Sequence, residues 1–199
     1  MLTPQKSLST FRSIVGSAFS YERVEADPAV MYLLDPQSRI VYCNLAWNRF
    51  ANDNDAPELV REKVIGTSVL DVTVDPLRGF YEHIYSQVKK AREPWEYNFE
   101  CSSDEQYRML RMRIFPLPKS FLLVENSVRV ERPHTAVAVD TTEFCYTDSR
   151  GMVVMCAHCR RTRHPDTDRW DWVPRFVANL PPNTSHGLCK NCRSFYFGS

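Results

Sequence analysis

Two pairs of cysteines near the C-terminus carry the clearest chemical signal in the sequence. Cys156 and Cys159 are separated by two residues, and Cys189 and Cys192 repeat this spacing. A two-residue gap lets one tight turn aim both thiolates at a single ion about 2.3 Å away, and four thiolates complete the closed tetrahedral shell of a structural zinc site. We therefore predict that these four cysteines hold one structural Zn²⁺.

Three other side chains could enter this set. His158 lies inside the first pair, His186 lies three residues before the second pair, and Cys145 lies upstream of both. Each is a chemically suitable zinc ligand, so the sequence leaves open whether one of them replaces a cysteine. A single C-x-x-C pair can also act as a redox dithiol, but two pairs in one short segment favour a metal.

The residues around these pairs predict a small unit over residues 143–199. Residues 144–147 and 152–155 have the pattern of a hairpin, whose second strand leads into the first cysteine pair. The 29 residues between the pairs contain apolar side chains at helical spacing over 172–180, and Pro174 is acceptable only in the first turn of that helix. Such a unit buries little core, so metal binding would supply the missing free energy of folding.

The text CAHCRRTR…RWDWVPRFV…SHGLCKNC, within residues 155–192, resembles a cysteine-rich C-terminal segment found after sensor domains in bacterial signalling proteins. In such segments the first cysteine pair is often followed by basic residues, as C-x-x-C-[KR]-x-[KR]. Here the basic residues are shifted by one position, since Arg160 and Arg161 are followed by Thr162 and Arg163. The resemblance implies kinship with signalling proteins, and it does not imply a particular reaction.

Residues 8–22 predict an amphipathic helix with one apolar stripe. A short helix of this kind cannot stand alone, so its stripe must pack either on a second copy of the chain or on the domain that follows. A homodimer contact and simple capping of the domain are therefore the two interpretations. The stripe consists of Leu8, Phe11, Val15 and Ala18.

Residues 25–130 predict a series of strands and helices in the order β-β-α-α-α-β-β-β. A Pro-containing turn joins the first two strands, and Asn44 can cap the helix that follows them. Alternation of Leu110, Met112 and Ile114 with arginines predicts a sheet with one wet face. The expected elements are strands 30–34 and 39–43, helices 45–51 and 58–64, a long helix starting at Asp75-Pro76 and ended by Pro94, and strands 95–101, 107–115 and 121–124.

This order resembles the PAS (Per-Arnt-Sim) sensor domain over roughly residues 25–130. The residues that carry the resemblance are LLDPQSRIVYCNLAWNRFA and GFYEHIYSQVKKAREPWEYNFE. It implies an α+β fold, a five-stranded antiparallel sheet with helices on one face. We thus expect an N-terminal helix in 1–24, a sensor domain in 25–130, a linker in 131–142 and the zinc unit in 143–199.

The long helix limits what such a sensor domain could hold. Haem-binding PAS domains place a histidine on the inner face of this helix, but His83 lies outside the apolar stripe. The flavin photochemistry of the family needs a cysteine before the helix, and residues 52–75 contain none. We expect neither haem nor flavin. Phe80, Tyr81 and Ile84 would instead line a small apolar ligand site, with Tyr81 as its polar group.

Composition excludes several classes of protein. The apolar fraction of 43% is typical of a packed core, and no apolar stretch approaches the ~20 residues of a membrane span. The six glycines form neither a GxGxxG nor a GxxxxGK[ST] motif, which excludes a Rossmann dehydrogenase and a P-loop enzyme. Seven cysteines without a secretion signal favour the reducing cytoplasm.

The net charge of +1 conceals an asymmetry between the two parts of the chain. Residues 1–149 carry 17 basic and 21 acidic side chains, whereas residues 150–199 carry eight basic and three acidic ones. Five arginines around the predicted zinc site could meet the phosphates of a nucleic acid: Arg160, Arg161, Arg163, Arg169 and Arg175. A zinc ion with four thiolates adds a charge of about −2, however, and no recognition helix is evident. Nucleic-acid binding is therefore the weaker interpretation.

These observations predict a cytoplasmic signalling protein without catalytic activity. No Ser-His-Asp or paired-carboxylate constellation is evident. The PAS-like domain would sense a small ligand or mediate dimerisation, and the zinc unit would relay the signal to a downstream protein. The alternatives are a zinc-containing nucleic-acid-binding regulator and, with less support, a C-x-x-C thiol redox protein.

Overall fold

The computed structural model describes residues 4–16, 19–54 and 56–198, without the side chains of residues 4–8, 143 and 144. Contacts between residues divide the chain into two compact units. The first comprises Met1–Thr73, Tyr81–Asn98 and Leu110–Val128, and the second comprises Val74–Phe80, Phe99–Met109 and Arg129–Ser199. The second unit therefore includes the start of a long helix and the ends of three strands as well as the C-terminal residues.

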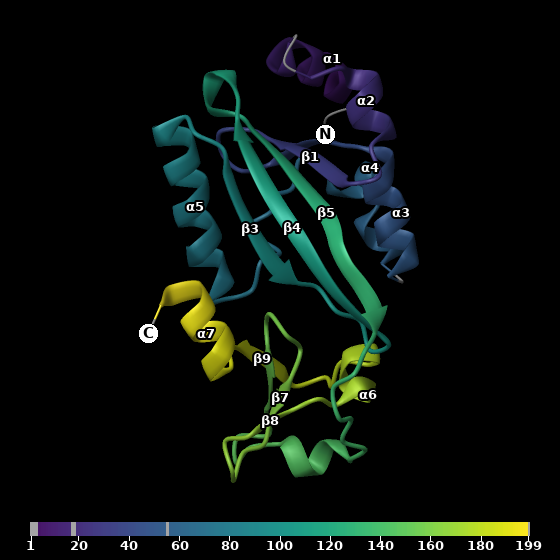
Figure 1. Cartoon of the computed structure of the whole chain (residues 1–199), viewed down its shortest axis with the longest axis vertical. Helices are drawn as coiled ribbons and strands as arrows, with labels where there is room; N and C mark the ends of the chain where they lie inside the picture. The colour runs from purple at the N-terminus through teal and green to yellow at the C-terminus, as the bar shows by residue number, and fades with distance from the viewer. Residues whose placement is uncertain (1–3, 17–18, 55, 199) are drawn as a thin grey trace. The chain divides into compact units, whose positions relative to one another are not determined.

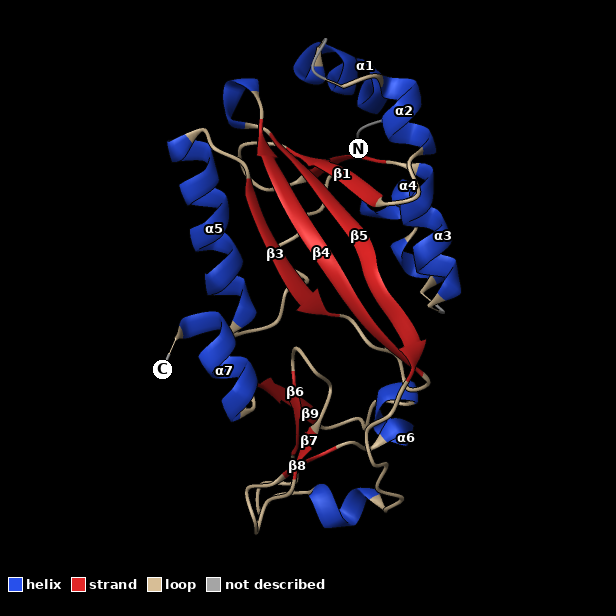
Figure 2. Cartoon of the chain, viewed as in Figure 1, coloured by secondary structure: helices blue, strands red, loops and turns tan. Residues whose placement is uncertain are grey.

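One sheet has five antiparallel strands in the order β2-β1-β5-β4-β3, and Figures 1 and 2 label β1, β3, β4 and β5 among them. The predicted α+β class and five-stranded sheet are confirmed. Its strands are β1 (Val30–Leu34), β2 (Ile40–Cys43), β3 (Trp95–Glu100), β4 (Gln106–Pro116) and β5 (Leu122–Pro133). The central strand β5 pairs with β1 from Leu34 opposite Leu122 to Val30 opposite Asn126.

Helices cover one face of this sheet, as predicted. They are α3 (Leu45–Asp53), α4 (Arg61–Val64) and α5 (Leu77–Ala91), with a short 3-10 helix η1 (Pro57–Leu59) before α4. Tyr32 of β1 points to this side, where its ring meets Trp47 of α3 at 5.3 Å and its hydroxyl contacts Tyr85 of α5. The predicted inward positions Leu110, Met112 and Ile114 are buried.

The N-terminal segment forms two helices where the sequence predicted one over residues 8–22. Helix α1 (Pro4–Val15) ends before Gly16, whose φ of +56° a helix cannot contain, and α2 (Tyr21–Ala26) begins after its N-cap Ser20. Phe11 and Val15 are buried against the sheet face opposite α3 and α5, in a cluster with Leu33 and Leu123. The stripe is therefore covered by this chain and does not require a second copy. Its other members, the Leu8 side chain and Ala18, lie outside the described residues.

Replacing Phe11 with alanine tests this packing. Phe11 is 1% exposed, and its ring lies 4.4 Å from that of Tyr42. We expect Phe11→Ala to lower the free energy of unfolding by about 3 kcal/mol, as for other buried phenylalanines. Urea unfolding would measure the change, and the exposed neighbour Ser13→Ala should shift it by less than about 0.5 kcal/mol. A Phe11→Ala change as small as that of the control would contradict the packing.

The end of β5 and the start of α5 differ from the sequence predictions. Strand β5 runs to Pro133, although the sequence predicted a strand of four residues, so residues 131–133 of the expected linker are strand. The second half of β5 is exposed to solvent. A run of apolar residues is the sequence signal of a buried strand, so it does not reveal an exposed one. Helix α5 begins at Leu77, after a turn at Asp75-Pro76, and so Pro76 is not its first residue.

A second, four-stranded sheet lies within the C-terminal residues, in the order β8-β7-β6-β9. Its strands are β6 (Val153–Cys156), β7 (Thr162–Arg163), β8 (Trp170–Asp171) and β9 (Thr184–Gly187), and the helices beside them are α6 (Pro174–Ala178) and α7 (Lys190–Phe197). Strand β6 pairs antiparallel with β7 and parallel with β9. The interval between the cysteine pairs thus contains three short strands joined by turns and loops, and the predicted helix is reduced to the five residues of α6.

The predicted first strand of the C-terminal hairpin is wrong. Residues Glu143–Tyr146 form the 3-10 helix η3, and only Thr147 bridges to Val153. Tyr146 is buried, and its hydroxyl donates to Asp171 at 2.7 Å, which anchors η3 to β8. Burial and this hydrogen bond raise the pKa of Tyr146 to about 12. A single buried tyrosine therefore fixes this segment, where the hairpin pattern predicted a strand.

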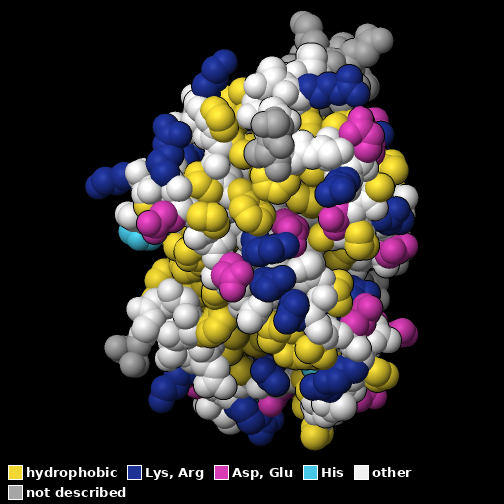
Figure 3. Space-filling model, turned by 45° about the horizontal axis from the view of Figure 1, so that its top comes forward, with side chains coloured by type: hydrophobic (Ala, Val, Ile, Leu, Met, Phe, Trp, Pro, Cys, Tyr) yellow, Lys and Arg dark blue, Asp and Glu magenta, His cyan; other side chains and the backbone are white. Residues whose placement is uncertain are grey.

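Two properties of the surface bear on partners. On the face drawn in Figure 3, acidic side chains lie among the basic ones. Within the described part of the chain, every helix is too short or too polar to cross a membrane.

Candidate metal centre

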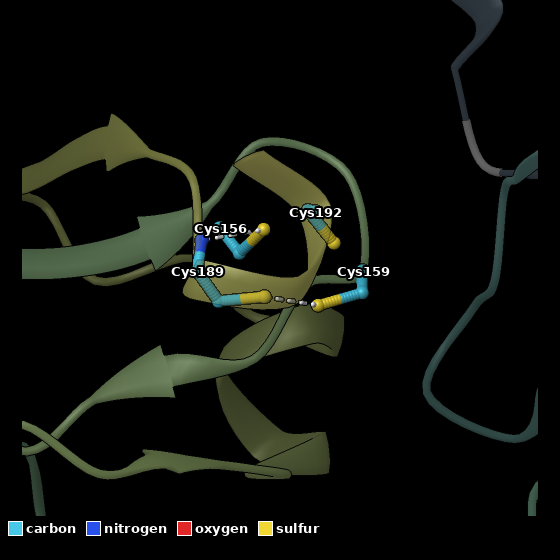
Figure 4. A group of neighbouring side chains, drawn as sticks. All are labelled: Cys156, Cys159, Cys189 and Cys192. Carbon is cyan, nitrogen blue, oxygen red and sulfur yellow. Dashed lines mark hydrogen bonds between the residues drawn. The ribbon is translucent and has the colours of Figure 1, made fainter. Parts of the chain in front are cut away.

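The end of β6 with the turn that follows it, and the start of α7, bring the predicted cysteines together (Figure 4). Cys156 ends β6, Cys159 lies in the turn that follows, Cys189 immediately precedes α7, and Cys192 lies in the first turn of α7. All four are buried, and their sulfur atoms lie within 4.8 Å of one another.

The spacing of the sulfur atoms fits a tetrahedral ion. Cys159 Sγ and Cys189 Sγ lie 3.8 Å apart. A tetrahedron with zinc–sulfur bonds of about 2.3 Å has sulfur–sulfur edges of about 3.8 Å, whereas a disulfide bond measures about 2.0 Å. The arrangement has the chemistry and dimensions of a four-thiolate zinc site, with all four ligand positions taken by protein.

Backbone hydrogen bonds set the turn that carries the first pair. The Cys156 N–H donates to Arg161 O at 2.8 Å, and the Arg160 N–H donates back to Cys156 O at 3.1 Å. Arg160 adopts a φ of +59° to close this turn. The Cys189 N–H donates to Cys156 Sγ at 3.4 Å, which ties the second pair to the first. The local chain thus places the sulfur atoms through its backbone.

The electrostatics of the cluster favour a thiolate. Hydrogen bonds from the thiols of Cys159, Cys189 and Cys192 hold the pKa of Cys156 well below its ordinary value. Burial alone would lower the pKa of the half-buried Arg161, but the neighbouring Cys159 raises it overall. A cation therefore stands beside a group of sulfurs that would carry net negative charge around zinc.

The three alternative ligands lie outside the cluster, which among the described residues consists of the four cysteines. His158 has both ring nitrogens engaged elsewhere, because Nδ1 lies 2.6 Å from Tyr196 Oη and Nε2 accepts the Glu100 N–H at 3.3 Å. His186 lies on β9 opposite Met155. Cys145 is exposed in η3.

The residues predicted to line a sensor ligand site lie along α5. Tyr81 and Ile84 are half-buried, and the Tyr81 ring lies 6.1 Å from that of Tyr85. Phe80 belongs to the second unit, where its ring meets that of Tyr196 at 4.9 Å. His83 is exposed, as its position off the apolar stripe predicted.

Sequence reasoning missed a pair of buried phenols in the first unit. Tyr32 and Tyr85 are 5% and 3% exposed, and each is within hydrogen-bonding reach of the other. Burial raises the pKa of Tyr32 to about 12, and burial also raises that of Tyr85. Both phenols therefore stay neutral at physiological pH. A tyrosine in a strand or on a helix face carries no local signal for such a pair, since the two are 53 positions apart in the sequence.

Comparisons with known proteins identify PAS domains among solved structures. The PAS domain of Bordetella pertussis BvgS is 19% identical, covers 55% of this chain and 82% of its own, and has a TM-score of 0.43. The PAS domain of the Cronobacter turicensis quorum-sensing receptor RpfR, in complex with C12:0, is 16% identical, with 54% and 99% covered and a TM-score of 0.43. That of nitrogen regulation protein NR(II) from Vibrio parahaemolyticus is 15% identical, with 55% and 99% covered and a TM-score of 0.40.

No family model and no curated protein matches the sequence. The sheet has the five antiparallel strands that the resemblance to PAS domains predicted. The cysteine cluster predicted for the C-terminal region is likewise present.

Proposed function

We propose that this chain is a non-catalytic signalling protein in which a PAS-like sensor module, residues 25–130, is joined to a structural zinc unit, residues 143–199. The sensor module would respond to a small ligand or to contact with another protein, and the zinc unit would pass the response to a downstream partner. The observation that carries the proposal is the closed cluster of four buried cysteines, Cys156, Cys159, Cys189 and Cys192, in a chain that also contains a PAS-like sheet.

The cluster supports a structural role for the metal. Catalytic zinc keeps one position open for water or substrate, whereas four protein thiolates leave none. Zinc bound here would join the end of β6 to the start of α7 and so hold together a unit with a small apolar core. That core comprises Tyr146, Val153, Met155, Val173 and Phe176.

Thiol redox chemistry has less support. Catalytic dithiols present at least one partly exposed, reactive sulfur. Here all four sulfur-bearing residues are buried, and Cys159 and Cys189, from different pairs, are as near to each other as tetrahedral ligands would be. We propose that these thiols remain reduced in the cytoplasm and bind metal.

Nucleic-acid binding also has less support, because several arginines of the second unit are paired with its own carboxylates. Arg150 contacts Asp148 at 2.8 Å, and Arg169 contacts Asp171 at 2.7 Å. Arg163 forms a further pair with Asp168. The positive charge counted from the sequence is thus partly neutralised by neighbouring carboxylates.

A small apolar ligand near Tyr81 and Ile84 and a homodimer remain part of the proposal. The buried phenols of Tyr32 and Tyr85 lie on the same side of the sheet and could orient a polar group of such a ligand. The dimer lacks the support of the N-terminal stripe, since Phe11 and Val15 are buried within the chain. Sedimentation equilibrium at tens of micromolar protein would measure the assembly state.

Elemental analysis of the purified full chain, together with its visible spectrum, tests the proposed cofactor. We expect one zinc per chain under reducing conditions, because four thiolates form a closed zinc shell. We expect no Soret or flavin absorption. Absence of zinc would contradict the structural zinc unit, and a Soret band in protein from haem-replete cells would contradict the expectation of an apolar ligand.

A further inference from the structure

The turn between the first two cysteines carries a histidine that faces away from the metal cluster. His158 lies between Cys156 and Cys159, and neither of its ring nitrogens is directed to the sulfurs. Nε2 accepts a backbone N–H, so the proton of the neutral ring lies on Nδ1 and is donated to the Tyr196 hydroxyl. One side chain of the metal turn thus holds two groups from distant parts of the sequence.

The first of these groups is a donor at the open edge of the five-stranded sheet. Strand β3 is the last strand in that sheet, and Glu100 is its last residue. The next amide, Cys101 N–H, donates inward to Arg108 O at 2.9 Å, so the Glu100 N–H is directed outward, away from β4. An outward amide of an edge strand has no partner within its own sheet. Here His158 Nε2 accepts it at 3.3 Å.

The second group is the hydroxyl of Tyr196 on α7. Tyr196 is 8% exposed, and its Oη lies 2.6 Å from His158 Nδ1. Its ring meets Phe80, in the first turn of α5, edge-to-face at 4.9 Å. All of these residues belong to the second unit, and both α5 and β3 continue from it into the first unit.

We propose that His158 is a positioning residue that couples metal occupancy to the end of β3 and, through Tyr196, to the start of α5. The metal fixes the turn that carries His158, and the histidine in turn holds the Glu100 amide and the Tyr196 hydroxyl. Coupling between two sites is reciprocal. If zinc binding shifts the conformational equilibrium of β3 or α5 by some factor, a signal that moves β3 or α5 changes the affinity for zinc by that same factor. This inference rests on the proposed metal site and gives its relay a physical route.

Amide hydrogen exchange of the full chain, measured by NMR with Zn²⁺ bound and after its removal by a chelator, tests the coupling. Removing zinc from the unmodified protein should accelerate exchange at Glu100 by about fivefold, the factor expected for loss of one hydrogen bond. The amide of Cys101, bonded within the sheet, should change less. In zinc-loaded His158→Ala, Glu100 should already exchange at the faster rate, and zinc affinity should fall by about fivefold.

Two further variants separate the coupling from general loosening. Tyr196→Phe keeps the ring contact with Phe80 and removes only the hydroxyl, so it should lower zinc affinity while leaving Glu100 protected. His186→Ala removes another half-buried histidine of the same unit and should leave zinc affinity and Glu100 exchange unchanged.

Two results would overturn the coupling alone: a zinc-loaded His158→Ala protein that still protects Glu100, or equal acceleration at Glu100 and Cys101 when the unmodified protein loses zinc. A protein that takes up no Zn²⁺ would overturn the metal site together with the coupling.

Discussion

Replacing any one of Cys156, Cys159, Cys189 or Cys192 with serine is expected to reduce bound zinc from one ion per chain to none and to unfold the small sheet of the second unit. Three thiolates leave the tetrahedral shell open, and a serine hydroxyl is a poor zinc ligand. Structural zinc contributes on the order of 10 kcal/mol in small zinc-binding peptides, which is more than a unit with so little core can lose. Elemental analysis would measure the metal, and near-UV circular dichroism would measure the loss of packing around Trp170, which lies against the cysteines.

A matched control comes from the same unit. Cys145 is exposed and lies outside the cluster, so Cys145→Ser should retain the full zinc content and the native spectrum. Treating the unmodified protein with a chelator should reproduce the spectrum of the cluster variants. Full zinc content in any of the four cluster variants, or equal loss in Cys145→Ser, would show that the ligand set is wrong.

The metal ligands could be predicted because their signal is local. A two-residue gap between cysteines is visible in a stretch of four residues, and it requires no knowledge of the fold. The sheet between the pairs was missed because β7 and β8 have two residues each, too few for alternation to be visible. Helix α7 was missed for a related reason, since Phe195 and Phe197 are about half exposed and its residues show no simple apolar stripe.

In the first unit, turn and cap signals predicted the hairpin and α3. Which side chains of α5 are buried, in contrast, depends on the strands that the helix packs against. At about 100° per residue, Tyr85 lies roughly 80° from Leu77 around the helix, at the margin of the apolar stripe. It is nevertheless 3% exposed, whereas Phe80, on the other margin, is only half-buried. The buried face of α5 is therefore rotated toward Tyr85, because Tyr32 of β1 provides a partner there. Such a rotation follows from strand order and cannot be read from the helix alone.

Asn44 forms more hydrogen bonds than the helix cap that the sequence predicted. The sequence predicted an N-cap, and Asn44 Oδ1 does accept the Trp47 N–H of α3 at 3.2 Å. The same oxygen also accepts the Met31 N–H of β1 at 3.0 Å, and Nδ2 donates to Val24 O at 3.0 Å and to Ala29 O at 2.9 Å. Asn44 is 0% exposed, so one buried amide joins α2, β1 and α3.

Asn44→Ala should therefore lower the free energy of unfolding by about 3 kcal/mol or more, well above the ~1 kcal/mol typical of a lost N-cap. The excess arises because the Met31 N–H and the Ala29 carbonyl would lose the buried partner that the Asn44 side chain provides, whereas Val24 O would keep only the Asp27 N–H. Urea unfolding of the full chain would measure it. Asn52→Ala, at an exposed position of the same helix, should change the value by less than about 0.5 kcal/mol.

Asn44→Asp separates the cap from the wider network. A carboxylate keeps both acceptor contacts, but its second oxygen would face the carbonyls that Asn44 Nδ2 now satisfies, and this raises the pKa of the new carboxyl in the folded state. The folded variant then binds more protons than the unfolded chain, so its stability should fall as pH rises through the folded-state pKa and recover in acid. If Asn44 were only a helix cap, Asn44→Asp would be nearly as stable as the unmodified protein at pH 7, since Asp and Asn cap equally well.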